Sequence, residues 1–131
     1  MRMFLYFNIL LAAALLYACN GNSLTTNDDL IFPETDVTFR DHVYPFLKTK
    51  CSYQGCHGPT TPGVRTLETY ENLTVDFPIL VRPGEPENSR FMQYIDGTIP
   101  HRGTGFREGY ITDNQIEGIR IWIKEGAVYS K

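Results

Sequence analysis

The sequence of 131 residues lacks a strong excess of charge of either sign. Twelve Lys and Arg stand against fifteen Asp and Glu, which gives a formal net charge of −3. A general nucleic-acid-binding protein neutralises phosphates with surplus basic residues, so this balance argues against that class. Also missing are three enzyme signatures, namely G-x-S-x-G, H-E-x-x-H and a phosphate-binding loop. The length leaves room for one small domain.

Strand patterns and internal repeats are also missing, and cysteines number only three. The chain has eleven Gly and eight Pro, many of them between residues 58 and 88, which favours loops joining short helices. The sequence therefore predicts a mainly α domain with long loops. Such a domain has a thin core of its own, and a bound group at its centre would complete it.

The N-terminal residues 1–18 have the pattern of an export signal. Arg2 is followed by an apolar stretch of about fifteen residues, which is short for a membrane-spanning helix. Its end, L-Y-A-C at 16–19, resembles the lipobox of bacterial lipoproteins. That resemblance implies cleavage before Cys19 and acylation of this cysteine, and more than one acyl chain gives stable anchoring. The alternative is a signal anchor in which Cys19 is inert.

The part after the signal divides into a tether and a domain. Residues 19–34 are rich in Asn, Thr, Ser and Asp, and we expect them to be a flexible, solvated tether. Residues 35–131 form the expected domain. In an exported, oxidising compartment, the two cysteines that remain could be joined in a disulfide.

The first helix of the domain is predicted to begin at Thr35 or Asp36, either of which can cap a helix. Pro45 lacks a backbone N–H, so we expect a kink or a split there. The helix runs into Cys51. Its apolar stripe consists of Phe39, Val43, Phe46 and Leu47.

The last helix has the clearest signals. Thr112 and Gln115 match a capping box, and Gly126 suits a left-handed residue after the helix. Its apolar stripe consists of Ile116, Ile119, Trp122 and Ile123. Between the terminal helices, one short helix is predicted around residues 67–73 and another from Asn88 or Ser89 to Ile95. The buried face of the second is formed by Phe91, Met92 and Ile95.

The sequence C-S-Y-Q-G-C-H at 51–57 is the candidate functional motif of the chain. In c-type haem attachment, two thiols bind the haem vinyl groups and the histidine after the second cysteine binds the iron. Cys51, Cys56 and His57 match these roles, although four residues separate the cysteines instead of two. Five helical steps place side chains about 140° apart, so this segment must leave helical geometry. Gly55 accepts the backbone conformations that this requires.

Other interpretations of the motif remain open at this point. A Cys51–Cys56 disulfide with His57 at the surface is the main alternative. Zinc binding is disfavoured because a second pair of ligands at suitable spacing is missing. A redox-active dithiol is disfavoured because that chemistry uses C-x-x-C.

Five short stretches, in the same order, resemble the planctomycete-type c-type cytochrome domain, which is common in exported lipoproteins of Bacteroidetes-like bacteria. The stretches are H-V-Y-P-F-L at 42–47, C-H-G at 56–58, G-V-R-T-L at 63–67, V-R-P-G-E-P-E-N-S at 81–89, and W-I with G-A within 122–127. The resemblance implies a class I cytochrome c-like fold, in which the terminal helices pack together and loops surround the haem. It also implies haem c, with its iron, attached to Cys51 and Cys56 and bound by His57.

The chain departs from this family at the sixth iron ligand. Where the family usually has a Met followed by Pro-Pro or Pro-His, this chain has I-P-H at 99–101. We expect His101 to be the sixth ligand, with Met92 as the alternative and an open site as the third option. Two histidines give a lower reduction potential than Met and His.

Weaker expectations concern residues around the site. The carbonyl of Pro59 or Pro62 is predicted to accept a hydrogen bond from His57, which would fix its tautomer. His42 is expected to be a surface or helix-packing histidine and not a ligand. Candidate partners of a haem propionate are Arg65, Tyr70 and Trp122, with core packing favoured for Trp122.

The expected function is that of a membrane-tethered monohaem c-type cytochrome. It would carry single electrons in the periplasm to or from a redox partner protein, with no bond chemistry and therefore no enzyme activity. The expected location is a bacterial membrane, facing the periplasm, with the outer membrane favoured. One alternative is an open-site haem sensor with weak peroxidase activity. Another is a haem-free interaction module with a Cys51–Cys56 disulfide.

Overall fold

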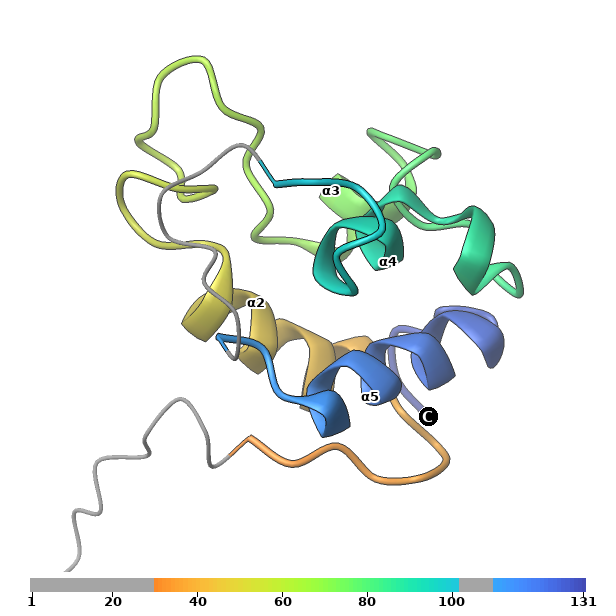
Figure 1. The fold of residues 1–131 in the computed structure, drawn as a ribbon. Helices are drawn as coiled ribbons and strands as arrows, with labels where there is room; N and C mark the ends of the chain where they lie inside the picture. Colours follow the sequence, from red (N-terminus) through yellow and green to blue (C-terminus); the bar gives the residue numbers. More distant parts are fainter. Residues whose placement is uncertain (1–29, 102–109) are drawn as a thin grey trace, which may run out of the picture.

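A computed structural model describes residues 30–101 and 110–131, which form short helical segments joined by loops (Figure 1). The segments are η1 (Phe39–Val43), α2 (Tyr44–Lys50), α3 (Tyr70–Thr74), η2 (Pro86–Asn88), α4 (Arg90–Ile95) and α5 (Asp113–Lys124). In these two ranges the chain forms no β-strand, which confirms the predicted mainly α architecture. Residues 1–18, Cys19 and the tether up to residue 29 lie outside the described part. Within that part, no helix is long and apolar enough to cross a membrane.

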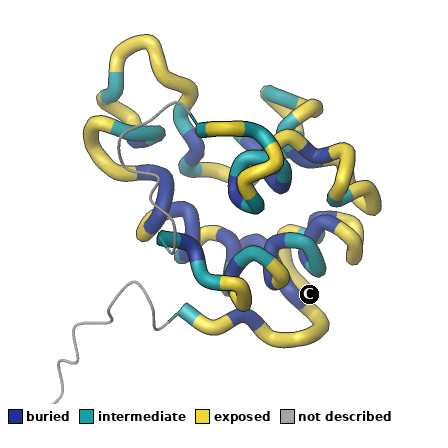
Figure 2. The backbone as a smooth tube through the Cα atoms, viewed as in Figure 1, coloured by how far each residue is buried: buried dark blue, intermediate teal, exposed yellow. Residues whose placement is uncertain are grey.

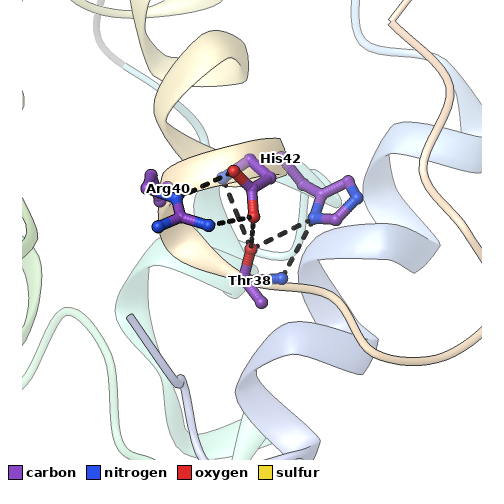
Figure 3. A network of polar contacts seen from close by, with 4 residues as sticks. Thr38, Arg40 and His42 are labelled. Carbon is purple, nitrogen blue, oxygen red and sulfur yellow. Dashed lines mark hydrogen bonds and ion pairs between the residues drawn. The ribbon is translucent and has the colours of Figure 1, made fainter. Parts of the chain in front are cut away.

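The first helical segment begins later than predicted. Thr38, not Thr35 or Asp36, caps it, because the Thr38 hydroxyl accepts a hydrogen bond from the Asp41 backbone N–H at 3.3 Å. The Thr38 N–H in turn donates to Nδ1 of His42 at 3.1 Å (Figure 3). His42 therefore packs against the start of its own helix, as expected. Asp36 has a φ of 62°, which places it in a left-handed turn before the helix.

The predicted break at Pro45 is confirmed. A π-helical turn, η1, ends at Val43, and α2 begins at Tyr44 with Pro45 in its first turn. Proline fits this position because the first N–H groups of a helix have no partner within the helix. The whole predicted stripe is buried, with exposed fractions between 0% and 3% for Phe39, Val43, Phe46 and Leu47.

The capping box predicted for the last helix is also confirmed. The Gln115 N–H donates to the Thr112 hydroxyl at 3.3 Å, and the Thr112 N–H donates to Oε1 of Gln115 at 3.2 Å. Gly126 follows α5 with a φ of 97°, as expected. Ile119, Trp122 and Ile123 are fully buried, whereas Ile116 is half-buried.

The N-terminal and C-terminal helical segments lie together in one layer, with α3 and α4 above them (Figure 1). The rings of Phe39 and Trp122 are 6.1 Å apart. The Val128 carbonyl accepts hydrogen bonds from the Phe39 N–H at 2.9 Å and from the Trp122 indole N–H at 3.0 Å. Exposed chain is concentrated in the loops (Figure 2). The helical layer is therefore the packed base on which the loops rest.

The two middle helices differ in how well they were predicted. α3 begins at Tyr70, three residues after the predicted start at residue 67, because Thr69 and Asn72 form a capping box there. α4 begins after Ser89 and buries Phe91, Met92 and Ile95, as predicted.

The packed part of the chain already includes residues that were expected to belong to the tether. Phe32 is 3% exposed, and its side chain lies against Gly118, where a Cβ would collide with it. The Asn114 side chain accepts a hydrogen bond from the Phe32 N–H at 2.8 Å and donates one to the Phe32 carbonyl at 3.1 Å. The segment from Leu30 is thus attached to the start of α5.

Candidate functional site

The cysteine motif lies in the loop that leaves the end of α2. The Leu47 carbonyl accepts hydrogen bonds from the N–H groups of Cys51, at 2.9 Å, and Ser52, at 2.7 Å, which ends the helix. The His57 N–H then donates to the Cys51 carbonyl at 2.9 Å and closes the loop. Gly55 has a φ of 88° within it, so the predicted departure from helical geometry is confirmed.

The two cysteines of the motif are free thiols in the structure. Cys51 is 6% exposed and Cys56 is half-buried. Burial raises the pKa of the Cys51 thiol to about 12, and the nearby Cys56 thiol adds to this effect. Cys51 is therefore protonated at neutral pH, and the two sulfur atoms are close enough to influence each other.

The ring of His57 is oriented by a backbone carbonyl. Its Nδ1 lies 2.7 Å from the carbonyl oxygen of Arg65. A carbonyl oxygen can only accept, so Nδ1 carries the proton and donates it. The other ring nitrogen, Nε2, is then the one available to bind a metal.

The prediction that Pro59 or Pro62 accepts this hydrogen bond was wrong. The chain turns twice after the motif, with bonds from Thr61 N–H to the Gly58 carbonyl and from Val64 N–H to the Thr61 carbonyl, both 3.4 Å. These turns carry the two prolines past His57 and return the chain beside it at Arg65.

The structure brings His101 next to His57. Their ring centroids are 5.8 Å apart and the ring planes are inclined by 76°. A bond from zinc to an imidazole nitrogen is about 2 Å, so two imidazoles on opposite sides of one metal ion have ring centroids about 6 Å apart. The observed separation fits that arrangement.

His101 is also in a suitable electrostatic environment. Its Nδ1 is shielded from solvent, and the ring of Tyr94 lies 6.0 Å away. Burial lowers the pKa of His101, and the nearby His57 adds to this effect. Both effects favour the neutral ring, which is the form that binds a metal ion.

Met92, the alternative sixth ligand, is placed differently. Its side chain is fully buried in the hydrophobic core, on the apolar face of α4. Ile99 is half-buried, with its N–H bonded to the Gln93 carbonyl at 2.8 Å. The arrangement therefore favours His101 as the partner of His57, and core packing is the common use of methionine.

The three side chains predicted to meet a haem propionate are engaged within the protein. The Arg65 guanidinium stacks on the Phe77 ring, 3.6 Å from its centroid. The Tyr70 hydroxyl donates to the Ala127 carbonyl at 3.0 Å. Trp122 is fully buried between the terminal segments, where core packing was favoured.

Sequence reasoning missed two residues that hold the motif in place. The buried Ser52 hydroxyl donates to the Leu67 carbonyl, and the Leu67 N–H donates to the His57 carbonyl at 3.0 Å. Lys50, the residue before Cys51, is only 3% exposed. Lysine is almost never fully buried, so its burial could not be expected from its residue type.

The candidate site therefore offers two imidazoles, from His57 and His101, and two thiols, from Cys51 and Cys56. In the ranges 30–101 and 110–131, no group of three or more His, Cys, Asp or Glu side chains gathers around a common point. A haem iron needs only axial ligands from the protein, and two imidazoles can supply them. Comparisons with family models, with curated proteins and with solved structures find no match to this chain.

Proposed function

We propose that the protein is a membrane-tethered monohaem c-type cytochrome with a class I cytochrome c-like fold. One observation carries this proposal. The His57 ring, oriented by the Arg65 carbonyl, lies edge-on to the His101 ring with centroids 5.8 Å apart, and His57 directly follows a pair of free cysteines in the sequence. A surface histidine beside a structural disulfide would need neither a fixed tautomer nor a second imidazole at this distance.

The residues present fit haem c. Cys51 and Cys56 would hold it through thioether bonds, and His57 and His101 would bind its iron. When bound, haem would supply an iron that can gain and lose one electron. The protein's part is to hold the His57 proton at Nδ1 through the Arg65 carbonyl and to keep the His101 ring neutral by burial. Neither role involves making or breaking a bond in a substrate, so the proposed protein is an electron carrier and not an enzyme.

The packing of the chain supports this function. The terminal helical segments share one layer, as the resemblance implies for the class I fold, and the motif leaves that layer at the end of α2 (Figure 1). A haem between His57 and His101 would add apolar contacts in the loop region. The proposed cellular role further includes acylation of Cys19, export to the periplasmic side of a membrane, and a redox partner protein.

The test is an absorption spectrum of the full chain, exported with its own signal in a host that has the c-type haem maturation machinery. A Soret band that stays with the protein after acid–acetone extraction is the expected result, because thioether bonds resist extraction. Cys56→Ser is the matched variant, and it should lose part of the covalent haem. A colourless protein with Cys51 and Cys56 joined to each other would refute the proposal and favour the haem-free interaction module.

The sixth ligand is tested by His101→Ala with Met92→Leu as its control. The native protein should give six-coordinate, low-spin spectra in both redox states. His101→Ala should give a high-spin site that binds CO or cyanide, whereas Met92→Leu should keep the native spectrum. If the native protein is already high-spin and binds CO, the open-site sensor is the better assignment.

A further inference from the structure

A cavity of about 360 Å³, which the proposed function does not use, is lined by residues of η1, α2, the start of α3 and the C-terminal segment. Four aromatic side chains form much of its lining, and we call them the aromatic box: Phe39, Tyr44, Tyr70 and Tyr129. Small-molecule sites are typically cavities of about 300–1,000 Å³ with a mainly apolar lining and a few polar groups. The cavity has the size and the lining of such a site.

The rings of the box stand around the cavity in different directions. The rings of Phe39 and Tyr129 are nearly parallel, inclined by 21° with centroids 5.8 Å apart. The Tyr70 ring is almost perpendicular to both, at 77° and 85°. Phe39 is 3% exposed, whereas Tyr44 and Tyr129 are 42% and 51% exposed. The box therefore has a buried base and walls that are open to solvent.

Hydrogen bonds fix the position of two walls. The Tyr129 carbonyl accepts a hydrogen bond from the Arg40 N–H at 3.0 Å. The Tyr70 hydroxyl donates to the Ala127 carbonyl at 3.0 Å. These bonds attach the C-terminal segment to η1 on one side and to α3 on the other. A site that is held in this way loses little conformational freedom when a ligand enters, which favours binding.

The charged side chains around the box are of two kinds. Arg40 donates to the Asp41 carboxylate at 2.9 and 3.2 Å, and the Lys48 ammonium group pairs with Glu68 at 2.7 Å. Glu71 also lines the cavity and is exposed. Among the residues that the structure describes, no basic side chain pairs with its carboxylate. The two pairs are neutral overall, so Glu71 gives the cavity a net negative charge.

A negative charge beside aromatic faces favours a cation, because the face of an aromatic ring is itself negative. In the ranges 30–101 and 110–131, the cation–π contacts of the protein are made elsewhere, by Lys50 with Tyr110 and by Arg65 with Phe77. A primary ammonium group brings three N–H donors that need acceptors once they leave water. A methylated ammonium group has fewer N–H donors or none, and aromatic cages are the usual protein sites that bind it.

We propose that the aromatic box binds a small organic cation with a methylated ammonium group, which the rings of Tyr44, Tyr70 and Tyr129 surround and the Glu71 carboxylate attracts. No lining residue of the cavity belongs to the motif loop, residues 51–67, so the inference is independent of the proposed function. Such a group can come from a free solute, such as choline, or from the headgroup of a choline lipid.

The experiment is a calorimetric titration of the purified full chain with choline. Choline should bind, and its neutral analogue of the same shape, 3,3-dimethylbutanol, should bind about tenfold more weakly because it lacks the charge that the rings attract. Glycerophosphocholine distinguishes the two sources: binding as tight as that of choline indicates a lipid headgroup, and weaker binding indicates a free solute. Absence of choline binding, or equal binding of the neutral analogue, would overturn the inference.

Variants at exposed positions test the two parts of the site. Tyr129→Leu removes one wall and should weaken choline binding about tenfold, whereas Tyr129→Phe keeps the ring and should bind like the native chain. Glu71→Gln should weaken binding about threefold, and Glu34→Gln, which changes an exposed carboxylate outside the cavity, should have no effect. Native affinity in both Tyr129→Leu and Glu71→Gln would overturn the inference. Choline binding by a chain without covalent haem would uphold it while refuting the cytochrome assignment.

Discussion

Two regions of the molecule are held together by different interactions. The helical layer of η1, α2 and α5 buries a continuous apolar set, with Phe46, Ile119 and Trp122 fully enclosed. The motif loop, residues 51–67, is held mainly by hydrogen bonds, which run to the carbonyls of Leu47 and Leu67 at its two ends. Apolar packing is insensitive to direction, whereas each hydrogen bond depends on a particular geometry.

The difference shows why the candidate site lies where it does. The cysteines and His57 need defined directions, which backbone hydrogen bonds supply, and they need a rigid base, which the helical layer supplies. We therefore expect the loop to depend on the layer more than the layer depends on the loop. The next three predictions test that asymmetry, in order of decreasing effect.

The largest effect is expected from removing a large side chain from the core of the helical layer. Trp122→Ala removes a fully buried side chain and its hydrogen bond to the Val128 carbonyl. It should lower the free energy of unfolding by about 3–5 kcal/mol, measured by urea denaturation. Lys124→Ala on the exposed side of the same helix is the control, with a change within about 0.5 kcal/mol. Similar losses for both variants would show that α5 is not a packed base.

A medium effect is expected from the motif loop. Ser52→Ala removes the buried hydroxyl that donates to the Leu67 carbonyl and leaves that acceptor unsatisfied. The expected loss is about 1–3 kcal/mol, seen as faster amide exchange at His57 and Leu67. Amides of α5 should keep their protection, and the exposed Ser130→Ala should change nothing. Equal loss of protection in α5 would mean that loop and layer open as one unit.

The smallest effect is expected from replacing the capping threonine of two different helices. Thr112 and Thr69 both cap helices through a capping box, but Thr112 is half-buried before the twelve-residue α5 and Thr69 is exposed before the five-residue α3. Thr112→Ala should cost about 1 kcal/mol and Thr69→Ala about half of that, since water replaces the exposed bond. The measurement is again urea denaturation. A larger loss for Thr69→Ala would show that the exposed cap of α3 contributes more to stability than the half-buried cap of α5.

The helical layer was largely predictable because its signals are local. A capping box and a 3.6-residue stripe identified α5, and Pro45 located the break before α2. The first cap was placed too early, although Thr38 and Asp41 show the same Thr-x-x-acid pattern that marks a helix start. That signal was available in the sequence.

The surroundings of the site were predicted less well, because they depend on contacts between distant residues. Any residue can offer a backbone carbonyl, so the sequence does not show that Arg65 is the one that faces His57. The burial of Lys50 depends on Tyr110, which lies 60 positions away. We expected His101 near His57 only because the stretch at 99–101 resembles one that supplies an iron ligand in c-type cytochrome domains, and the two rings have centroids 5.8 Å apart.

The attachment of Phe32 to the start of α5 has a mechanical consequence. A force that pulls on the chain ahead of Leu30 meets the fold first at the Leu30 carbonyl, which accepts a hydrogen bond from the Gln115 side chain at 3.2 Å. It then meets the paired hydrogen bonds between Phe32 and Asn114 and the Phe32 ring over Gly118. Asn114 and Gly118 both belong to α5, so tension on the N-terminal side of the domain is transmitted directly to this helix.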